Sequence, residues 1–443
     1  MRTVNVGIVG YGTVGNGVAK ILLEQSDLIK QKSNCQINLK KVYTRNWDKK
    51  FLYPLPDNLK AKNLEELLED PEIDIMVEVV GGIEFPYRFI TQALERGKHI
   101  VTANKALLAE KGKNIFQLAQ DKNLRIGFEG AVAGGIPVIR ALREGLVANS
   151  ISKVYGILNG TTNYILTSME KEGKSFKQAL NEAQEKGYAE ADPTLDINGI
   201  DAAHKISILA SLSFGGFLDF NQVYVEGIES IDSLDIELGR ELGYTLKLLA
   251  IAKSHEEEVE VRVNPTFLPS DHPLSKVDGV FNAVMVEGSN VGEVMFYGKG
   301  AGSLPTASAV VSDVVSIAKS IQLDMGQEGE ITSINWKHKE LNLTKVKDFY
   351  TRYYIRFTVP DVTGILAKIA SVFASYRISI AAVIQKEKVI KLHREDIQNL
   401  VPLVILTHTA SENSVQQSIK DIVKQKLSIK RPVIIRVEDE EEY

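Results

Sequence analysis

The sequence has very little cysteine: Cys35 is the single one among 443 residues. This excludes an intrachain disulfide framework and any metal site built from several thiolates. No run of about 18 apolar residues occurs, and no charged segment with a separate apolar stretch precedes the first predicted strand, so neither a membrane span nor a signal peptide is expected. These absences predict a reducing, cytoplasmic setting.

An excess of positive charge is also missing. The chain has 52 Lys and Arg against 57 Asp and Glu, a formal net charge of -5, so it lacks the overall basic field that attracts nucleic acid. Hydrophobic residues make up 44% and charged residues 25%, which is ordinary for a globular protein. The length is sufficient for two or three domains.

A glycine-rich turn lies close to the beginning of the chain. Residues 4–9 form an apolar run typical of a strand buried on both faces, and GYGTVG follows at 10–15, ahead of a helical pattern. Gly10 permits the tight turn, Gly12 allows the backbone to approach a pyrophosphate, and Gly15 allows the helix to pack closely on the strand. The helix amides then face the phosphates, so this order predicts a dinucleotide site rather than a turn that binds nothing.

Alternating strands and helices continue from there. Strands are predicted at 36–43, 73–80, 99–102 and 124–128, and helices at 86–96 and 106–120. This alternation predicts a doubly wound parallel sheet, which binds ligands at the carboxyl ends of its strands. Lys105 follows one of these strands by three residues and is therefore placed to meet cofactor or substrate, although by itself it reads as a surface lysine.

The end of the second predicted strand bears on the choice of cofactor. An NAD-preferring site has Asp or Glu there to bind the ribose hydroxyls, whereas this sequence has Arg45, followed by Lys49 and Lys50. A positive charge suits the 2′-phosphate, so NADP(H) is predicted to be preferred. Asp48 lies close enough to leave NAD(H) possible, and a solvated loop explains Arg45 equally well.

Charged side chains are concentrated in residues 187–205, GYAEADPTLDINGIDAAHK. The proline prevents the first half from forming one regular helix, whereas apolar spacing after Gly199 predicts a helix. Asp201 and Lys205 are four residues apart and share one face of it. A carboxylate and an amine beside an acidic loop suit a zwitterionic substrate and a proton transfer, although a surface ion pair is the commoner reading of this spacing.

A different pattern begins near residue 150. A strand is predicted at 153–158, and the NGTTN that follows it begins a helix whose hydroxyl and amide donors can hold a carboxylate or simply cap the helix. Later strand-like runs indicate a mixed sheet with helices on one face. A glycine loop at 298–303 precedes a helical run at 306–321, which is expected to return to the nucleotide domain and to bring Gly302 near the cofactor.

Six motifs occur in a characteristic order: GYGTVG, TANK, EGAVAGGIP, NGTTN, GYAEADPTLDINGIDAAHK and YGKGAGSLPTASAVVSD. Over residues 1–323 they resemble the homoserine dehydrogenase family. The resemblance implies an oxidoreductase that interconverts L-homoserine and L-aspartate 4-semialdehyde with NAD(P), in threonine, methionine and isoleucine biosynthesis. It also implies a homo-oligomer, a dimer or a tetramer, with its contact in the substrate domain.

The resemblance also assigns residues by position. The cofactor contacts that it and the glycine turn imply are Gly10, Tyr11, Gly12, Thr13, Val14, Gly15, Arg45, Lys105 and Gly302. The substrate contacts are Glu190 and Asp196 for the amino group, beside Gly160, Thr161 and Tyr188. Asp201 and Lys205 lie at the reacting carbon, and Lys205 is the usual proton donor and acceptor, but the sequence leaves the choice between Lys105 and Lys205 open.

A monovalent cation, expected to be sodium, is the other implied ligand. The family places it between Glu129 and the backbone carbonyls of Val132, Gly134 and Ile136. A site made of oxygens, partly carbonyls, fits a hard cation. The residues alone also allow Glu129 to cap the turn that follows it.

The C-terminal region has a separate resemblance. After a polar connector at 324–350, a βαββαβ order over 351–437 with the turn PDVTGIL resembles an ACT domain, a family that commonly binds amino acids between paired modules. Asp361, Gly364 and Ile365 lie at the turn where such ligands dock, and L-threonine is the expected inhibitor. A purely structural dimerisation domain is the alternative. The final EDEEEY is expected to be a solvated acidic tail.

The predicted architecture is therefore α/β in three parts. A Rossmann-type NAD(P)-binding domain spans 1–135 and receives the helix 304–322, an α+β catalytic and dimerisation domain spans 136–323, and a ferredoxin-like ACT domain spans 351–437. An acylating semialdehyde dehydrogenase is disfavoured because it needs a cysteine nucleophile near the substrate. The remaining alternative is a non-catalytic sensor of NADPH and an amino acid, which has no need of both lysines and the acidic loop.

Overall fold

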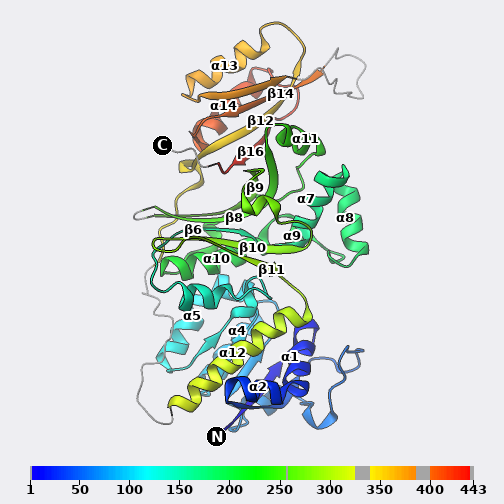
Figure 1. Ribbon diagram of the computed structural model, residues 1–443, viewed down its shortest axis with the longest axis vertical. Helices are drawn as coiled ribbons and strands as arrows, with labels where there is room; N and C mark the ends of the chain where they lie inside the picture. Colours follow the sequence, from blue (N-terminus) through cyan, green and yellow to red (C-terminus); the bar gives the residue numbers. More distant parts are fainter. Residues whose placement is uncertain (1, 256–257, 325–339, 386–399, 440–443) are drawn as a thin grey trace.

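The computed structural model describes residues 2–255, 258–324, 340–385 and 400–439. An N-terminal, a middle and a C-terminal part follow one another along the long axis of the molecule (Figure 1). The middle part contacts both of the others, through helix α10 (Ile200–Phe214) on one side and strand β9 (Glu258–Pro269) on the other.

The N-terminal part is built on a five-stranded parallel sheet. In spatial order its strands are β2 (Gln36–Tyr43), β1 (Thr3–Val9), β3 (Ile75–Glu78), β4 (His99–Thr102) and β5 (Ile126–Gly127). One face packs on α1 (Thr13–Glu24) and α12 (Ser303–Asp324), the other on α3 (Glu65–Leu68), α4 (Glu84–Glu95) and α5 (Lys105–Asp121). The predicted doubly wound sheet is confirmed. Its strand order changes direction between β1 and β3, where such folds bind ligands.

Helix α12 comes late in the sequence but lies on the N-terminal sheet. It crosses α1 so closely that a Cβ on Gly17 would lie 2.8 Å from the Cβ of Ala307. Among the described helices, α12 alone is long and apolar enough to cross a membrane, and 56% of that stretch is buried. Its apolar residues face α1 and the sheet, as in the core helix of a globular domain.

The middle part is a second, largely antiparallel sheet. Its long strands are β11 (Gly292–Lys299), β10 (Phe281–Gly288), β6 (Ile151–Ile157), β8 (Tyr244–His255) and β9, and a short β7 (Tyr224–Val225) pairs with β9 in parallel. The accompanying helices are α7 (Gly160–Glu172), α8 (Phe176–Glu185), α9 (Thr194–Ile197), α10 and α11 (Ser233–Glu241). Helices α7 and α10 both pack against β8, and α10 separates this sheet from the N-terminal part.

Strand β8 was not among the predicted strands. Its first nine residues are all buried, because Leu246 and Leu248 face α10 while Leu249 and Ile251 pack on the opposite side of the sheet. A strand that is apolar on both faces has no alternating pattern, so periodicity cannot distinguish it from a buried helix.

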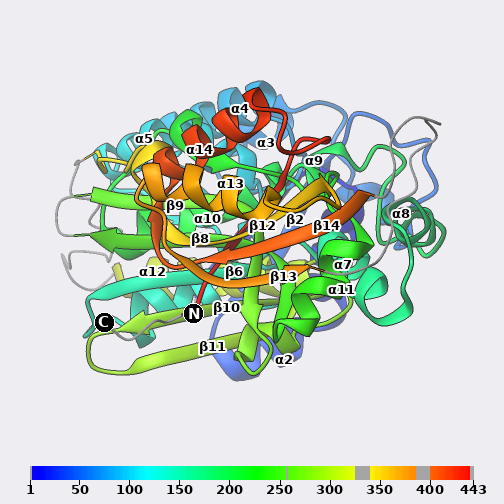
Figure 2. The same ribbon diagram turned by 90° about the horizontal axis from the view of Figure 1, so that it is seen from above.

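The C-terminal part is the predicted ferredoxin-like module. Its elements are β12 (Tyr350–Pro360), α13 (Ile365–Ser375), β13 (Ile380–Gln385), β14 (Leu400–Thr407), β15 (Ala410–Ser411), α14 (Glu412–Lys424) and β16 (Val433–Val437). The strands are paired in the order β16-β12-β14-β13, and α13 and α14 lie side by side over them (Figure 2). The middle of the polar connector, 325–339, lies outside the described residues, and 340–344 runs along the middle part, where Leu341 and Thr344 donate backbone hydrogen bonds to Phe217 and Val259.

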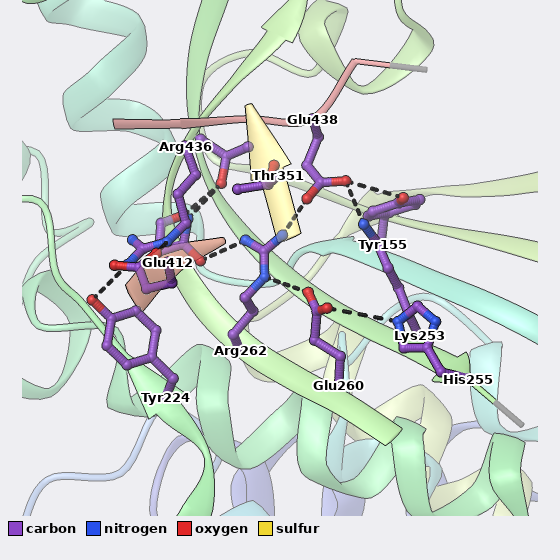
Figure 3. A network of polar contacts seen from close by, with 12 residues as sticks. Tyr155, Tyr224, Lys253, His255, Glu260, Arg262, Thr351, Glu412, Arg436 and Glu438 are labelled. Carbon is purple, nitrogen blue, oxygen red and sulfur yellow. Dashed lines mark hydrogen bonds and ion pairs between the residues drawn. The ribbon is translucent and has the colours of Figure 1, made fainter. Parts of the chain in front are cut away.

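The middle part and the C-terminal part share one sheet. Strand β16 pairs in parallel with β9, Arg436 opposite Thr266 and Val437 opposite Phe267, so that the middle and C-terminal strands form an 11-stranded sheet. The residue after β16, Glu438, is thereby held against Arg262 of β9, and Lys253 approaches it to 2.7 Å (Figure 3).

The expectation of a solvated acidic tail is therefore wrong for its first two residues. The side chain of Glu438 is 10% exposed and that of Asp439 25%, and Asp439 pairs with Arg352 at 2.5 Å. The strand pairing draws both carboxylates into a basic junction. Residues 440–443 lie outside the described residues.

Candidate functional site

The glycine turn after β1 contains two positions where the backbone requires glycine and one position that faces open space. Gly10 has a φ of 104°, and a Cβ on Gly15 would lie 2.0 Å from the carbonyl oxygen of Gly10, so both positions require glycine. A Cβ on Gly12 would meet no atom within 4 Å. The space in front of the first amides of α1 is therefore open, which fits a pyrophosphate.

Two other segments, the start of α12 and the loop after β3, border the open space at the glycine turn. Ser303, at the start of α12, donates from Oγ to the carbonyl oxygen of Thr13 at 2.6 Å, next to Gly302, whose φ is 123°. After β3, Gly81 and Gly82 have φ of 83° and 77°, and a Cβ on either would meet nothing within 4 Å. Open backbone thus surrounds the carboxyl ends of β1 and β3.

The side chain of Tyr11, which was expected to contact the cofactor, is buried against the loop after β2. Its residue is 1% exposed, because the ring packs on Trp47 and Phe51 and the hydroxyl donates to the carbonyl oxygen of Tyr53 at 2.9 Å. Burial raises the pKa of Tyr11 to about 12. The side chain therefore holds the loop after β2 in place and does not face the open space.

Arg45 follows β2 and lies at the edge of the same region. Its guanidinium carbon is 4.8 Å from the centre of the Phe85 ring, a cation–π contact with the first turn of α4. The positive charge is thus anchored close to the carboxyl ends of the strands rather than in a free loop.

A cleft of about 430 Å³ lies between the N-terminal sheet and the acidic loop. Its walls come from the glycine turn and the loops after β3 and β4 on one side, and from the acidic loop and α10 on the other. The residues that line it are Val14, Val79, Val80, Gly81, Gly82, Ala103, Asn104, Lys105, Ala106, Glu190, Asp192, Leu195, Asp196, Asp201 and His204. Five of the predicted site residues, Val14, Lys105, Glu190, Asp196 and Asp201, therefore meet at one cleft.

Two lysines from different parts of the chain meet at one carboxylate of this cleft. Lys105 begins α5, and its Nζ lies 3.1 Å from Oδ1 of Asp201. Lys205 lies one turn after Asp201 on α10, and its Nζ is 2.7 Å from Oδ2 and donates to the carbonyl oxygen of Leu158 at 2.6 Å.

The two lysines have unequal access to the cleft. The side chain of Lys105 is 39% exposed and that of Lys205 10%. Burial would raise the pKa of Asp201, but the charges of Lys205 and Lys105 and the hydrogen bonds from Lys205 and Asn159 hold it well below its usual value. Asp201 is therefore an ionised carboxylate between two amines.

The acidic loop is tied to the beginning of α7. Asp196 accepts hydrogen bonds from Asn159 at 2.7 Å and from the Thr161 hydroxyl at 3.0 Å, and the same hydroxyl approaches the carbonyl oxygen of Tyr188 at 2.8 Å. Glu190 is exposed at the rim. The Tyr188 ring packs on Tyr164, and a Cβ on Gly160 would lie 2.8 Å from the carbonyl oxygen of Val280, so this turn has no room for a side chain.

Three residues at this site were not predicted from the sequence. Asn159 joins Asp196 to Asp201, and its position at the beginning of NGTTN was the available signal. His204 lines the cleft and stacks on Phe220 at 4.5 Å. Glu78 is fully buried at the end of β3, where it accepts from Thr102 at 2.6 Å and from the amide of Val80 at 2.8 Å, and burial raises its pKa.

Glu129 makes the capping contacts that the sequence had left open. Its two carboxylate oxygens accept the backbone N–H groups of Ile139 and Arg140, each at 2.9 Å, and burial raises its pKa. Between them the chain turns through Ala133, with a φ of 51°, and Gly134, with a φ of 21°. No group of three or more His, Cys, Asp or Glu side chains that could hold a metal occurs among the described residues.

The predicted regulatory residues lie far from this cleft. Gly364 has a φ of 85° and precedes α13, Asp361 is exposed, and Ile365 is buried under the C-terminal module. Helix α13, which Ile365 begins, lies at the end of the molecule opposite the N-terminal part (Figure 1).

Three family models together match most of the chain. They are "Homoserine dehydrogenase, NAD binding domain" at residues 10–129, "Homoserine dehydrogenase" at 137–315 and "ACT domain" at 353–424. Among curated relatives, the homoserine dehydrogenase of Helicobacter pylori is 44% identical over 99% of this chain and 100% of its own length. That of Bacillus subtilis is 42% identical over 95% of this chain and 96% of its own length.

Solved structures extend the similarity to the arrangement of the parts. A homoserine dehydrogenase from Thiobacillus denitrificans has a TM-score of 0.91 at 40% identity and covers 99% of both chains. A hyperthermophilic archaeal homoserine dehydrogenase in complex with NADPH has a TM-score of 0.59 at 29% identity, over 73% of this chain and 99% of that chain.

Proposed function

This chain belongs to the homoserine dehydrogenase family, and we propose that the interconversion of L-homoserine and L-aspartate 4-semialdehyde takes place in the cleft between Lys105 and the acidic loop. One observation carries the proposal: Asp201, ionised and buried, holds the amines of Lys105 and Lys205 at that cleft. Oxidation of a primary alcohol needs a base for the hydroxyl proton, and reduction of the aldehyde needs an acid. A lysine amine serves both directions.

The acidic loop supplies the substrate site of this proposal. Asp196 and Glu190 bind the ammonium group of homoserine, because they present negative charge at the cleft opposite Lys105. Thr161 fixes one oxygen of Asp196 by a hydrogen bond, so the carboxylate is oriented before the substrate arrives. Gly160 and Tyr188 flank the bound molecule.

NADP(H) is the proposed cofactor, with NAD(H) as a weaker substitute. The open backbone at Gly12 and the first amides of α1 fit its pyrophosphate, and Arg45 fits the 2′-phosphate. The archaeal relative was solved with NADPH. When bound, the nicotinamide supplies the hydride acceptor or donor. Replacing Arg45 with Ala should raise the KM for NADP more than the KM for NAD.

A sodium ion at Glu129 is a further part of the proposal. The donor set of one carboxylate and the carbonyls of Val132, Gly134 and Ile136 is chemically suitable. The burial of Glu129, which is 4% exposed, supports it, since a bound cation would offset the cost of burying the charge. Thermal stability of the wild type should then rise with sodium more than that of Glu129→Gln.

Regulation is proposed to enter through the C-terminal module. ACT domains usually bind amino-acid effectors, and L-threonine is an end product of the pathway to which homoserine leads. The module is held to the middle part by a shared sheet and a buried charge network, so a change in one part is mechanically connected to the other (Figure 3). We place the enzyme in the cytoplasm as a homo-oligomer, a dimer or a tetramer.

The test is homoserine-dependent reduction of NADP and of NAD by the purified protein, with and without threonine, beside Lys205→Ala and Lys105→Ala. Turnover that is lost in the lysine variants and reduced by threonine supports both the reaction and its regulation. NADPH binding without turnover would instead favour a sensor. Full activity in the presence of threonine would leave the C-terminal module with a structural role.

A further inference from the structure

Asn159 occupies a hidden position behind the cleft. It follows β6 and caps the N-terminus of α7, where its Oδ1 accepts from the amide of Thr162 at 2.8 Å. The residue is 6% exposed and does not line the cleft itself. Capping a helix is a complete structural explanation for an asparagine at this place.

The other end of the side chain contacts the reaction site. Its Nδ2 donates to Oδ1 of Asp196 at 2.7 Å and to Oδ2 of Asp201 at 2.9 Å. The second of these oxygens also receives Lys205 at 2.7 Å. Both protons of one amide group are therefore used on two different carboxylates, one in the acidic loop and one on α10.

The orientation of this amide is fixed by its surroundings. The reversed amide would place Oδ1 against two carboxylates and its NH₂ group against the N–H of Thr162, which replaces three attractive contacts with repulsive ones. The observed orientation also requires both carboxylates to be acceptors. A hydrogen bond to an ionised carboxylate is stronger than one between neutral groups, and Asp201, whose pKa is held well below its usual value, against the effect of burial, mainly by the charges of Lys205 and Lys105, is such an acceptor.

We propose that Asn159 is a positioning residue of the dehydrogenase reaction: it holds the carboxylate that binds the substrate ammonium group at a fixed distance from the carboxylate that anchors the two lysines. The proposal rests on the functions proposed above for Asp196 and Asp201. Substrate binding and proton transfer take place at opposite ends of a four-carbon amino acid. One amide that bridges the two carboxylates therefore fixes the distance between the substrate-binding group and the proton-transfer group.

Isosteric replacement separates this function from helix capping. Asn159→Asp keeps the shape and the acceptor for the amide of Thr162, and aspartate caps helices as well as asparagine does. It removes both donors and adds a third carboxylate. Asn159→Ser keeps a cap, loses both donors and adds no charge.

Asn163→Asp is the matched control, one turn further along the same helix. Asn163 is also buried and also donates two hydrogen bonds from Nδ2, to the carbonyl oxygens of Val277 and Phe281 at 3.1 and 3.2 Å. The same chemical change there disturbs α7 without touching either carboxylate. The new charge would face Lys247, whose Nζ lies 3.4 Å from Oδ1 of Asn163, and the variant should leave the KM for homoserine and its pH profile unchanged.

The proposal predicts a combined kinetic defect. Asn159→Asp should raise the KM for homoserine and lower kcat, reducing kcat/KM by about 10- to 100-fold, as expected for the loss of two hydrogen bonds to charged groups. Asn159→Ser should show a smaller defect of the same kind. Unchanged KM and kcat in both variants would overturn the proposal and leave capping as the function.

A second readout does not depend on homoserine turnover. Three neighbouring carboxyl groups cannot all remain ionised, so one of them should take up a proton as the pH falls and should restore one donor. The thermal midpoint of Asn159→Asp should therefore approach that of the wild type between pH 8 and pH 6, while that of Asn159→Ser should not. Parallel curves for the two variants would contradict the bridge even if the wild type did not oxidise homoserine.

Discussion

Lys105 of the N-terminal part and Asp201 of the middle part form an ion pair of 3.1 Å across the cleft. The two residues belong to helices α5 and α10, which pack on each other along the boundary of the two parts. A change in the relative position of the parts would separate the amine from the carboxylate. The proposed reaction site is thus complete only when both parts are docked as they are here.

The first prediction concerns the negative charge of Asp201, which contacts both Lys105 and Lys205. Asp201→Asn keeps the shape but removes the anchor of both amines, so kcat for homoserine oxidation should fall about 100-fold or more. NADPH binding, measured by fluorescence, should change little, because Asp201 lies on α10, on the opposite side of the cleft from the glycine turn. A variant with normal kcat would exclude Asp201 from the proton-transfer machinery.

The glycine turn gives a matched pair of predictions. Gly15→Ala would place a Cβ 2.0 Å from the carbonyl oxygen of Gly10, so it should destabilise the N-terminal part by more than about 3 kcal/mol. Gly12→Ala meets no protein atom within 4 Å and should fold normally, yet should weaken cofactor binding by about tenfold, or ~1.4 kcal/mol. Thermal midpoints and cofactor titrations of both variants separate folding from binding. Equal effects of the two substitutions on stability would contradict the geometry.

His204 predicts a pH dependence of stability. Burial lowers its pKa from 6.5 to about 4, while Asp201 opposes this and the charges of Lys105 and Lys205 add to it. Between these values the unfolded chain binds a proton that the folded chain does not, so this residue's contribution makes stability rise with pH and fall as the pH drops from about 7 toward 4.

His204→Gln should remove that contribution. The thermal midpoint of the wild type should fall more steeply than that of the variant between pH 7.5 and pH 5. A wild type that gains stability over the variant at pH 5 would mean that the folded state binds a proton at His204, contrary to its burial.

The sequence was sufficient for the fold class and for several charged residues of the cleft, because these depend on local patterns. Glycine spacing, strand–helix alternation and the i,i+4 placement of Asp201 and Lys205 are all visible within short windows. Asn159 was hidden because its bridge joins residues 37 and 42 positions away. The burial of Glu438 was not predicted, because it results from the pairing of β16 with β9, and a local sequence pattern does not indicate which distant strands pair.

The last prediction concerns that junction. Glu438 bridges Arg262 and Lys253 of the middle part, and the two charges hold its pKa below the usual value against the effect of burial. Glu438→Gln retains the size and one acceptor but removes the charge that joins the C-terminal module to β8 and β9. If threonine acts through this junction, the variant should still bind threonine in calorimetry, yet its activity should be inhibited less than that of the wild type.

Glu185→Gln, at an exposed position on α8 away from the junction, is the control for the loss of one negative charge. It should respond to threonine as the wild type does. Breaking one side of a buried ion pair costs about 3–5 kcal/mol, so Glu438→Gln should also lower the thermal midpoint, and inhibition must be measured well below it. Full inhibition of a folded Glu438→Gln enzyme would show that the effector signal does not pass through Glu438, and would direct attention to other ionic contacts between the parts, such as that of Arg356 with Asp235 at 2.6 Å.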